Sequence, residues 1–261
     1  MHAEERERLI LGLVRTRGFT TFQQLDSQLD ASPATIRRDL ARLAKERLLV
    51  RVRGGVRLSA TPSVQDGGVA ELSGVPFHEN IGLHPHEKSA IGRAAAAFCV
   101  PGEGVMIDGG STTLQMCPHL AGLNLQVLTN SLHIVDALLS QPGTRILVPA
   151  GSVFREQNII LSASGHENMT RFHAPKLFMG AAAVGPHGIM QADVILVVSE
   201  RRLIERAEEI ILLVDSSKFQ GPSGHIVCGL DEIDVVITDA GVTKSQQEMV
   251  RAAGVRLIIA D

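Results

Sequence analysis

Apolar residues in the first part of the chain recur at the spacing of amphipathic helices. Residues 4–15 and 22–29 each place their large apolar side chains on one face, and Thr20 or Thr21 can cap the second segment. A third helical segment follows at 32–43 after a short turn. Three helices with a tight turn between the last two predict a helix-turn-helix.

The segment 32–43 has a well-marked start and a single apolar stripe. Ser32 can accept hydrogen bonds from the first-turn N–H groups, and Pro33 suits the first helical position. Ile36, Leu40 and Leu43 recur at i, i+4 and i+7 and form the stripe. The polar and basic residues around it suit contact with phosphates and base edges in a major groove. The alternative for this segment alone is an ordinary helix with a solvated charged face.

The alternation that follows predicts a β-hairpin. Residues 48–52 and 56–58 are short alternating segments on either side of Gly54 and Gly55. A basic hairpin behind a helix-turn-helix is a wing, whose arginines can reach backbone phosphates or the minor groove. The combination favours DNA binding over a solvated surface. The residues expected to contact DNA are Ser32, Ala34, Thr35, Arg37, Arg38, Arg42, Arg51 and Arg53.

The charge distribution supports that prediction. Residues 1–57 carry twelve Lys or Arg and seven Asp or Glu, a net charge of +5, while the remainder of the chain carries −8. The formal charge of −3 for the whole chain hides this asymmetry. A basic head on an acidic body indicates a polyanionic partner for the head alone. The absence of Trp and Tyr argues against the stacking platforms of single-strand binders.

The pattern changes from residue 76 onward, where short apolar strands alternate with helical segments. The strand candidates are 104–107, 125–128, 145–148, 176–179, 210–214, 234–237 and 255–259. The helix candidates are 87–98, 113–120, 132–139, 198–208 and 244–252. This alternation predicts an α/β domain with a mainly parallel sheet. We therefore expect a winged helix-turn-helix domain at 1–58, a Ser-, Gly- and Pro-rich linker at 59–75 and an α/β domain at 76–261.

The loops that follow four of these strands carry the candidate ligand chemistry. In parallel sheets ligands bind at the carboxyl ends of strands, where glycines admit a close ligand and helix starts favour anions. The loop at 108–113 suits a phosphate monoester and is neither a P-loop nor a dinucleotide turn. Any one loop alone could be an ordinary capped turn, but four converge on one sheet edge. The residues expected to bind a ligand are Asp108, Gly109, Gly110, Ser111, Thr112, Thr113, Thr129, Asn130, Ser131, Gly151, Asp215 and Lys218.

Cysteine and histidine spacing predicts no metal site and no cofactor. The three cysteines are far apart, so we expect reduced, buried thiols. His84 and His86 lie two apart, but a metal site would need a third ligand that the sequence does not indicate. The start of the chain is charged, and no apolar run approaches the ~20 residues of a membrane span. A cytoplasmic location is therefore expected.

The order and spacing of these motifs resemble the DeoR family of bacterial transcriptional regulators over nearly the whole chain. The family's recognition-helix pattern is similar to Ser32-x-x-Thr35-Ile36-Arg37-Arg38-Asp39-Leu40, followed by the wing glycines. The matching motifs of the second domain are Glu87-Lys88, 108–113, Thr129-Asn130-Ser131, Phe178-Met179-Gly180, 215–219 and Ile237-Thr238-Asp239.

The resemblance implies a sugar-phosphate sensor domain related in fold to ribose-5-phosphate isomerase. Family members are usually oligomeric repressors of sugar-catabolism operons, released from DNA by a phosphorylated sugar intermediate. For this chain the resemblance implies a phosphate loop at 108–113 and effector response at Asp215 and Lys218, and it adds Lys88 to the effector site. The implied partners are double-stranded operator DNA, a phosphorylated sugar or sugar acid, and further copies of the chain in a dimer or tetramer.

The sequence departs from the family pattern in three places. Arg53 stands where many members have His, and three alanines follow Gly180 where polar residues are common. The segment 188–193 also differs from the commoner version, which contains Thr and Asn. The usual sugar specificity therefore cannot be transferred, and Gln191 and Asp193 become candidates for binding sugar hydroxyls.

Two other functions fit parts of the sequence. In a sugar-phosphate isomerase with an accessory helical domain, Asp108, Asp193 or Asp215 could supply the carboxylate base. That function leaves the basic head unexplained, so we expect a regulator without turnover. A transcriptional activator would have the same motifs as a repressor.

Overall fold

The computed structural model describes residues 6, 7, 9–11, 13, 14, 19–29, 31–45, 49–52, 55–58, 76–162, 172–221 and 224–261. The chain divides into two compact units, Met1–Glu71 and Leu72–Asp261, which we call the N-terminal and C-terminal units. The linker predicted at 59–75 lies outside the described residues. None of the helices that the structure describes is long and apolar enough to cross a membrane.

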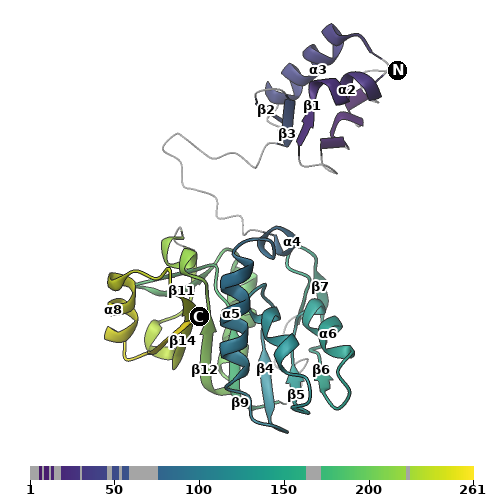
Figure 1. Cartoon of the computed structure of the whole chain (residues 1–261). Helices are drawn as coiled ribbons and strands as arrows, with labels where there is room; N and C mark the ends of the chain where they lie inside the picture. Colours follow the sequence, from purple (N-terminus) through teal and green to yellow (C-terminus); the bar gives the residue numbers. More distant parts are fainter. Residues whose placement is uncertain are drawn as a thin grey trace. The chain divides into compact units, whose positions relative to one another are not determined.

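The N-terminal unit combines helices with a small antiparallel sheet (Figure 1). The described residues between 6 and 14 are helical. The other elements are β1 (Phe19–Thr21), α2 (Phe22–Gln28), α3 (Pro33–Lys45), β2 (Leu49–Val52) and β3 (Gly55–Leu58). Helices α2 and α3 and the β2–β3 hairpin confirm the predicted winged helix-turn-helix.

Side-chain caps mark the starts of α2 and α3. Thr21 caps α2: its hydroxyl accepts a hydrogen bond from the Gln24 N–H at 3.2 Å, and its own N–H donates to Gln24 Oε1 at 2.9 Å. Thr20 lies instead in β1, a strand that the sequence analysis missed and that pairs with β3. Ser32 caps α3 as predicted, since Ser32 Oγ accepts from the Thr35 N–H at 3.2 Å.

The predicted stripe of α3 is the buried side of that helix. Ile36, Leu40 and Leu43 are each at most 4% exposed. They pack in one apolar core with Ile10, Val14, Leu25, Leu29, Leu49 and Val56. Each large side chain removed from water stabilises the unit by about 1.5–3 kcal/mol. The stripe therefore fixes which face of α3 points outward.

A seven-stranded parallel sheet forms the centre of the C-terminal unit. Its strands are β4 (Gly104–Ile107), β5 (Gln126–Leu128), β6 (Arg145–Leu147), β9 (Ala174–Met179), β12 (Ala207–Leu213), β14 (Val235–Asp239) and β15 (Arg256–Ala260). They lie in the order β15-β14-β12-β9-β4-β5-β6, and all neighbouring pairs are parallel. All seven predicted strands are present, with ends shifted by no more than three residues.

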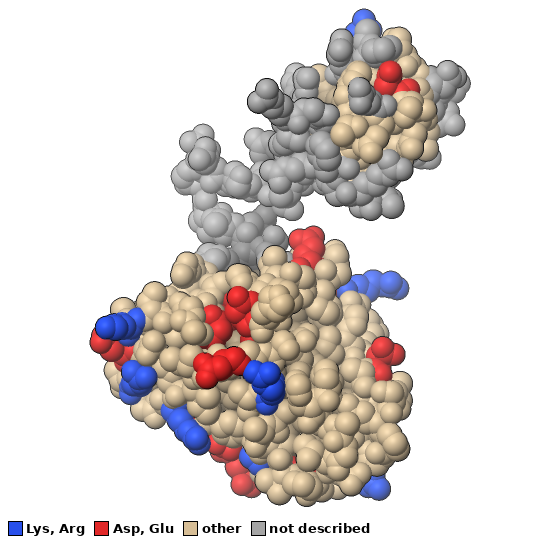
Figure 2. Space-filling model, viewed as in Figure 1, with Lys and Arg blue, Asp and Glu red and all other residues tan. Residues whose placement is uncertain are grey.

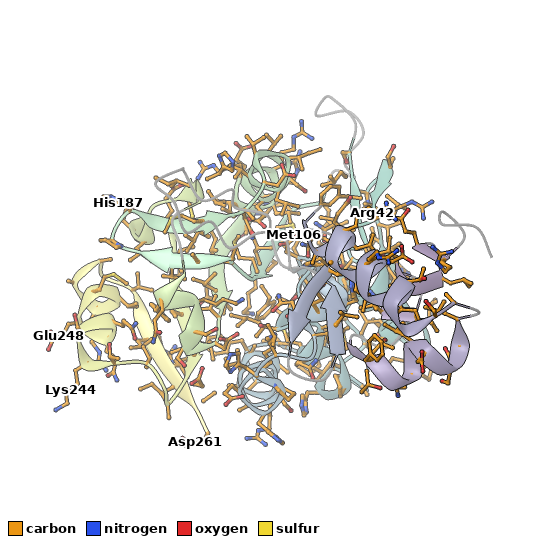
Figure 3. The ribbon with its side chains drawn as sticks, turned by 90° about the horizontal axis from the view of Figure 1, so that it is seen from above. Arg42, Met106, His187, Lys244, Glu248 and Asp261 are labelled. Carbon is orange, nitrogen blue, oxygen red and sulfur yellow. The ribbon has the colours of Figure 1, made fainter. Side chains whose placement is uncertain are left out.

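Both faces of the sheet are covered, so the unit has two apolar cores. One face carries α5 (Pro85–Ala96), which lies across the sheet in Figure 1, with η1 (Thr113–His119) and α6 (Leu132–Leu139). The other carries α7 (Val194–Ile204), α8 (Lys244–Ala252), and an antiparallel sheet of β10 (Ala183–Gly185), β11 (Gly188–Gln191) and β13 (His225–Cys228). Met106 of β4 lies in the interior, whereas Lys244 and Glu248 of α8 point outward (Figure 3).

A short 3-10 helix, η4 (Leu230–Glu232), follows β13, and three other small elements lie near the carboxyl ends of the strands. They are α4 (Phe77–Asn80), the hairpin of β7 (Ser152–Phe154) and β8 (Ile159–Leu161), and η3 (Ser216–Gln220). The Phe77 ring of α4 stacks on His133 of α6 with a centroid distance of 4.2 Å. The Phe77 N–H also donates to the carbonyl of Glu156, in the turn of the hairpin, at 3.1 Å. Helix α4 is therefore held between α6 and the hairpin.

Two helix predictions were inaccurate. The segment predicted at 113–120 is the 3-10 helix η1, which contains Pro118. The helix predicted at 198–208 is α7, which starts four residues earlier because Asp193 caps it and accepts from the Ile195 N–H at 3.0 Å. The apolar, β-branched run that opens α7 does not show a helical period, which is why the start was missed.

Candidate functional site

The order of the strands determines where a ligand can bind. From β4 the chain continues to β5 and β6 on one side, then crosses back to β9 on the other side of β4 and continues to β12, β14 and β15. The direction therefore reverses between β4 and β9. In open parallel sheets the crevice outside the carboxyl ends at such a point is the usual ligand site.

A cavity of about 130 Å³ lies at that point. Its wall includes the loop that follows β4, residues after β9, part of α7 and Lys218 of η3. Eight of the residues predicted to bind a ligand line it: Asp108, Gly109, Gly110, Ser111, Thr112, Asn130, Gln191 and Lys218. Just over half of the candidate ligand residues therefore lie around one cavity.

Hydrogen bonds fix the loop that follows β4. Thr113 Oγ1 donates to the carbonyls of Asp108 at 2.8 Å and Gly110 at 3.0 Å. Asn130 Nδ2 donates to Asp108 Oδ1 at 2.7 Å, while the Gly109 N–H donates to Asn130 Oδ1 at 2.8 Å. Asn130 thus connects the ends of β4 and β5. Thr113 has a bracing position within the loop and lies outside the cavity lining.

Three successive N–H groups of this loop remain available to a ligand. No residue that the structure describes accepts a hydrogen bond from the N–H of Gly110, Ser111 or Thr112. All three residues line the cavity. Successive unpaired N–H groups make a concave site for an anion, and a phosphate group has the acceptor oxygens to fill it.

Gly109 is required by close packing rather than by an unusual backbone angle. A Cβ atom at this position would lie 2.4 Å from Ile159 Cγ2 of the β7–β8 hairpin and 3.2 Å from Asn130 Oδ1. Any larger residue would therefore push the hairpin or Asn130 away from the loop. The glycine explains how β8 approaches the end of β4.

Two buried acids face this cavity. Asp108 is 3% exposed, and burial raises its pKa to about 6. Glu200 of α7 is 4% exposed, and burial together with the nearby negative charge of Asp108 raises its pKa well above its usual value. Glu200 Oε1 accepts a hydrogen bond from Gln191 Nε2 at 2.6 Å. Among the described residues, Glu200 Oε2 has no hydrogen-bond partner although it is buried.

Charged side chains also lie behind the cavity wall. Lys88 of α5 is buried, and its Nζ donates to the carbonyl and to the side-chain Oδ1 of Asn80, which lines the cavity. Burial lowers the pKa of Lys88 to about 8, an effect that the negative charge of Asp215 opposes. Asp215 itself caps η3, where its Oδ1 accepts from the Ser217 N–H at 3.1 Å. Lys88 and Asp215 therefore support the wall rather than line it.

The other predicted ligand residues also have structural contacts outside the lining. Ser131 caps α6 by accepting from the Ile134 N–H at 3.3 Å, and Thr129 Oγ1 accepts from the Ser131 N–H at 3.1 Å. Asp193 caps α7, and Gly151 lies before β7 in close contact with the Leu161 carbonyl. With Thr113, Lys88 and Asp215, these four complete the seven candidates that do not line the cavity.

The sequence analysis missed several residues that do line the cavity, Asn80, Gln157, Ser199 and Glu200 among them. A detectable signal existed for Glu200. The buried residues of α7 are Leu196, Glu200, Leu203 and Ile204, so the acid falls at i+4 within an apolar stripe. A charge in that stripe indicates a specific role. The signal was hidden because the predicted helix began four residues too late.

The N-terminal unit contains the candidate DNA interface. Arg38 is exposed on α3 and has no ion pair with any residue that the structure describes. Arg42 is also exposed but pairs with Glu7 at 2.6 Å, while Asp39 pairs with Arg6 at 2.9 Å. These two ion pairs connect α3 to the first helical segment. Arg38 is thus the better placed of the two arginines for a phosphate.

The remaining DNA candidates are described in part. The Thr35 hydroxyl lies 2.9 Å from the Ser32 hydroxyl, so both take part in the cap of α3. Ala34 and Arg37 lie on α3 and Arg51 lies on β2, and their side chains are outside the described residues. Arg53 also lies outside them.

The surface of the C-terminal unit differs from that expected of a DNA-binding domain. On the face drawn in Figure 2, acidic and basic side chains are mixed and several lie side by side on a mostly uncharged surface. Among the described residues no group of three or more His, Cys, Asp or Glu is arranged to hold a metal ion.

Comparison with known proteins identifies both units. Residues 6–61 match the model of the DeoR-like helix-turn-helix domain, and residues 83–240 match that of the DeoR C terminal sensor domain. The HTH-type transcriptional repressor GlcR of Bacillus subtilis (strain 168) is 30% identical over 262 residues, covering 100% of this chain and 98% of the relative. The putative aga operon transcriptional repressor of Escherichia coli O157:H7 is 30% identical over 98% of this chain and 93% of its own length.

A solved structure of ribose 5-phosphate isomerase A from Methanocaldococcus jannaschii is also similar, with 14% identity, a TM-score of 0.36, and coverage of 50% of this chain and 52% of that one. The family assignment rests on the two domain models and the full-length relatives. The chain belongs to the DeoR family of transcriptional regulators.

Proposed function

We propose that the protein represses a sugar-catabolism operon and that a phosphorylated sugar or sugar acid relieves the repression. The observation that carries this proposal is the cavity at the β4–β9 reversal, whose wall contains Lys218 and three N–H groups that donate to no described residue. The same chain carries a helix with an exposed arginine in a winged helix-turn-helix. An input site and an output surface on separate units are what a ligand-controlled repressor needs.

The phosphate binds at the loop end of the cavity. The N–H groups of Gly110, Ser111 and Thr112 supply donors, and Lys218 supplies the positive charge. Lys218 is the single Lys or Arg among the described residues that line the cavity. The carbon chain of the effector then extends toward Asn130 and α7.

The operator is read by a homo-oligomer in the cytoplasm. Two recognition helices bind successive major grooves when they lie about one DNA turn (~34 Å) apart, which calls for repeated or palindromic half-sites. Arg37, Arg38, Arg51 and Arg53 provide the positive charge for phosphate contacts.

Helix α4 transmits the state of the cavity to the linker. It is the first described element of the C-terminal unit, and Asn80 at its end both lines the cavity and accepts hydrogen bonds from Lys88. An effector that displaces Asn80 would also move Phe77, which stacks on His133. The effector acts through its different affinities for two arrangements of the oligomer. A coupling of about 1–3 kcal/mol weakens DNA binding roughly 5- to 150-fold.

We propose that the protein has no enzymatic turnover, although the cavity contains two acids with raised pKa values, a feature also found in active sites. Aldose–ketose isomerisation would need one of them beside a carbon-bound proton. Conversion of any sugar phosphate by the purified protein, followed by NMR, would contradict this part of the proposal.

Lys218→Ala tests the proposed function. Removing the only cation of the described lining should weaken the effector's release of DNA at least about tenfold in effector concentration, because a charge-assisted contact to phosphate is lost. DNA affinity without effector should stay unchanged, since Lys218 lies in the C-terminal unit. The measurement is a fluorescence-anisotropy titration of operator DNA with a panel of sugar phosphates.

Lys244→Ala is the matched control for Lys218→Ala. Lys244 is an exposed lysine on α8 and lies outside the cavity lining (Figure 3). The Lys244→Ala variant should release operator DNA at the same effector concentration as wild type. Equal responses of Lys218→Ala and wild type across the panel would remove Lys218 and this cavity from the effector site.

A further inference from the structure

The cavity that is lined by the cation Lys218 is also lined by two buried acids. Glu200 of α7 and Asp108 of the loop after β4 both line the cavity, and the negative charge of Asp108 acts on Glu200. Lys218 is the single basic side chain among the described lining residues. The same lining therefore combines N–H groups and a cation, which suit a phosphate, with two carboxyl groups, which suit a hydrogen-bond donor of the ligand.

Glu200 is built into this wall without its full set of hydrogen bonds. Its Oε1 accepts from Gln191, while its Oε2 is enclosed and has no donor among the described residues. A buried acceptor left without a donor destabilises the folded protein, and such groups occur where a ligand supplies the missing partner. A small turn of the carboxyl group would present it to a ligand in the cavity.

The chemistry of the wall determines which ligand group can lie beside Glu200. A hydroxyl or an ammonium group can donate to Glu200, and an ammonium group would also offset the charge of the two acids. A ligand carboxylate cannot donate, and it would add a third acid to a place that already raises the pKa of two. Because burial already opposes the ionised forms of both acids, one more negative charge in this wall costs more binding free energy than a missing contact does.

We propose that Glu200, held by Gln191 in the lining that it shares with Asp108, is a specificity-determining residue that selects effectors whose sugar carries a hydroxyl or amino group beside it and rejects phosphorylated sugar acids. This inference rests on the proposed function, because it assumes that a sugar phosphate occupies the cavity. It narrows the effector class to neutral sugar phosphates and amino-sugar phosphates.

Three matched ligands test this selectivity on the full-length protein. They are glucose 6-phosphate, glucosamine 6-phosphate and 6-phosphogluconate, which share the phosphate and differ in the other substituents. Isothermal titration should give a Kd for glucose 6-phosphate or glucosamine 6-phosphate at least about tenfold lower than that for 6-phosphogluconate. If wild type binds glucosamine 6-phosphate more tightly than glucose 6-phosphate and Glu200→Gln abolishes that difference, the partner of Glu200 is an ammonium group. If wild type binds these two ligands equally, the partner is a hydroxyl group.

Glu200→Gln removes one acid and keeps the shape and the acceptor for Gln191. It should reduce the preference against 6-phosphogluconate at least about fivefold, because a carboxamide can donate to a carboxylate. Asp108→Asn is a second variant in which the ratio of the Kd for 6-phosphogluconate to the Kd for glucose 6-phosphate is measured. Glu205→Gln, an exposed acid just after α7 that lies outside the lining, is the control and should keep the wild-type ratio.

The outcomes separate this inference from the function on which it rests. If wild type prefers 6-phosphogluconate, or if neither acid variant changes the ratio, the inference is wrong while the sugar-phosphate sensor stands. If wild type binds none of the three ligands and no inorganic phosphate at millimolar concentration, the proposed function fails and the inference fails with it.

Discussion

Asp108 is a buried acid in the lining of the cavity, and its pKa reflects two opposing effects. Its carboxylate accepts one strong hydrogen bond from Asn130, which lowers the pKa, but burial outweighs that bond and raises the pKa to about 6. An ionised carboxyl at this position therefore costs folding free energy at neutral pH. Such a cost is tolerated where a side chain serves a ligand.

The Asp108→Asn substitution should remove a pH dependence of stability. Between pH 4 and pH 6 the folded protein holds a proton on Asp108 that the unfolded chain releases. The stability contributed by this group is complete below about pH 4 and is lost as the pH rises through about 6, by about 3 kcal/mol in total. Asparagine can keep the acceptor for Asn130 and has no such loss.

The measurement is urea unfolding of the C-terminal unit at pH 4, 5, 6 and 7. The stability of Asp108→Asn relative to wild type should rise by about 3 kcal/mol across that range. Asp136→Asn, at an exposed position on α6, is the control and should follow wild type. Parallel profiles for Asp108→Asn and wild type would show that Asp108 is not the buried acid described here.

Single residues also show what the sequence could reveal about the site. Asp108, Gly109 and Ser111 were predictable because a Gly- and Ser-rich loop after an apolar strand lies at the carboxyl end of a parallel sheet, where ligands bind. Glu200 was not, because its importance comes from burial, and burial depends on where α7 begins. The sequence analysis assigned Asp193 and Thr113 to ligand binding, but in the structure Asp193 caps α7 and Thr113 braces the loop after β4. Composition alone does not distinguish these structural roles from ligand binding.

At the scale of elements, the parallel strands were predictable because they are short apolar runs buried on both faces. The strand β1 was not, because three residues next to a helix cap carry no period of their own. The start of α7 failed for a related reason: its first turn is apolar on every side, and only the cap at Asp193 marks it. The local sequence pattern thus predicted the strands of the parallel sheet, and it missed elements whose formation depends on contacts with distant parts of the chain.

Helix α4 is an element whose function depends on such partners. Phe77 is buried against His133 and bonded through its N–H to the hairpin turn, yet it does not line the cavity. The Phe77→Leu substitution should keep effector affinity within about threefold but reduce the effect of saturating effector on DNA affinity at least about threefold, because it loosens α4.

The test compares the Kd for operator DNA with and without saturating effector, beside the Kd for the effector itself. Phe98→Leu, which changes a half-buried ring at the edge of the core beneath α5, is the control and should keep wild-type coupling. Weaker effector binding by Phe77→Leu with unchanged coupling would place α4 in the binding site rather than between the site and the DNA.

At the scale of the whole molecule, the two parts that differ in function also differ in net charge. The positive charge is concentrated in residues 1–57, and the acidic remainder forms the sensor. Phosphate contacts provide affinity and make it depend on salt, whereas the sensor has no need of DNA. Whole-chain charge hides this, because opposite excesses in two units cancel.

The exposed arginine of α3 gives the sharpest test of the output surface. Arg38→Ala should weaken binding to the region upstream of the protein's own gene about tenfold and reduce the slope of log K against log salt by about one, as expected when one phosphate contact is lost. Arg42→Ala should show a different pattern, because Arg42 pairs with Glu7 and its loss also loosens α3 from the first helical segment. The Arg42→Ala substitution should lower the melting temperature of the N-terminal unit, which Arg38→Ala should leave unchanged.

Arg251→Ala, which changes an exposed arginine of α8, is the control for both and should bind DNA like wild type. The measurement is fluorescence anisotropy between 50 and 200 mM salt, a range over which such contacts change affinity strongly. An unchanged salt slope for Arg38→Ala would mean that α3 does not present this arginine to DNA, and the wing would then have to supply the phosphate contacts.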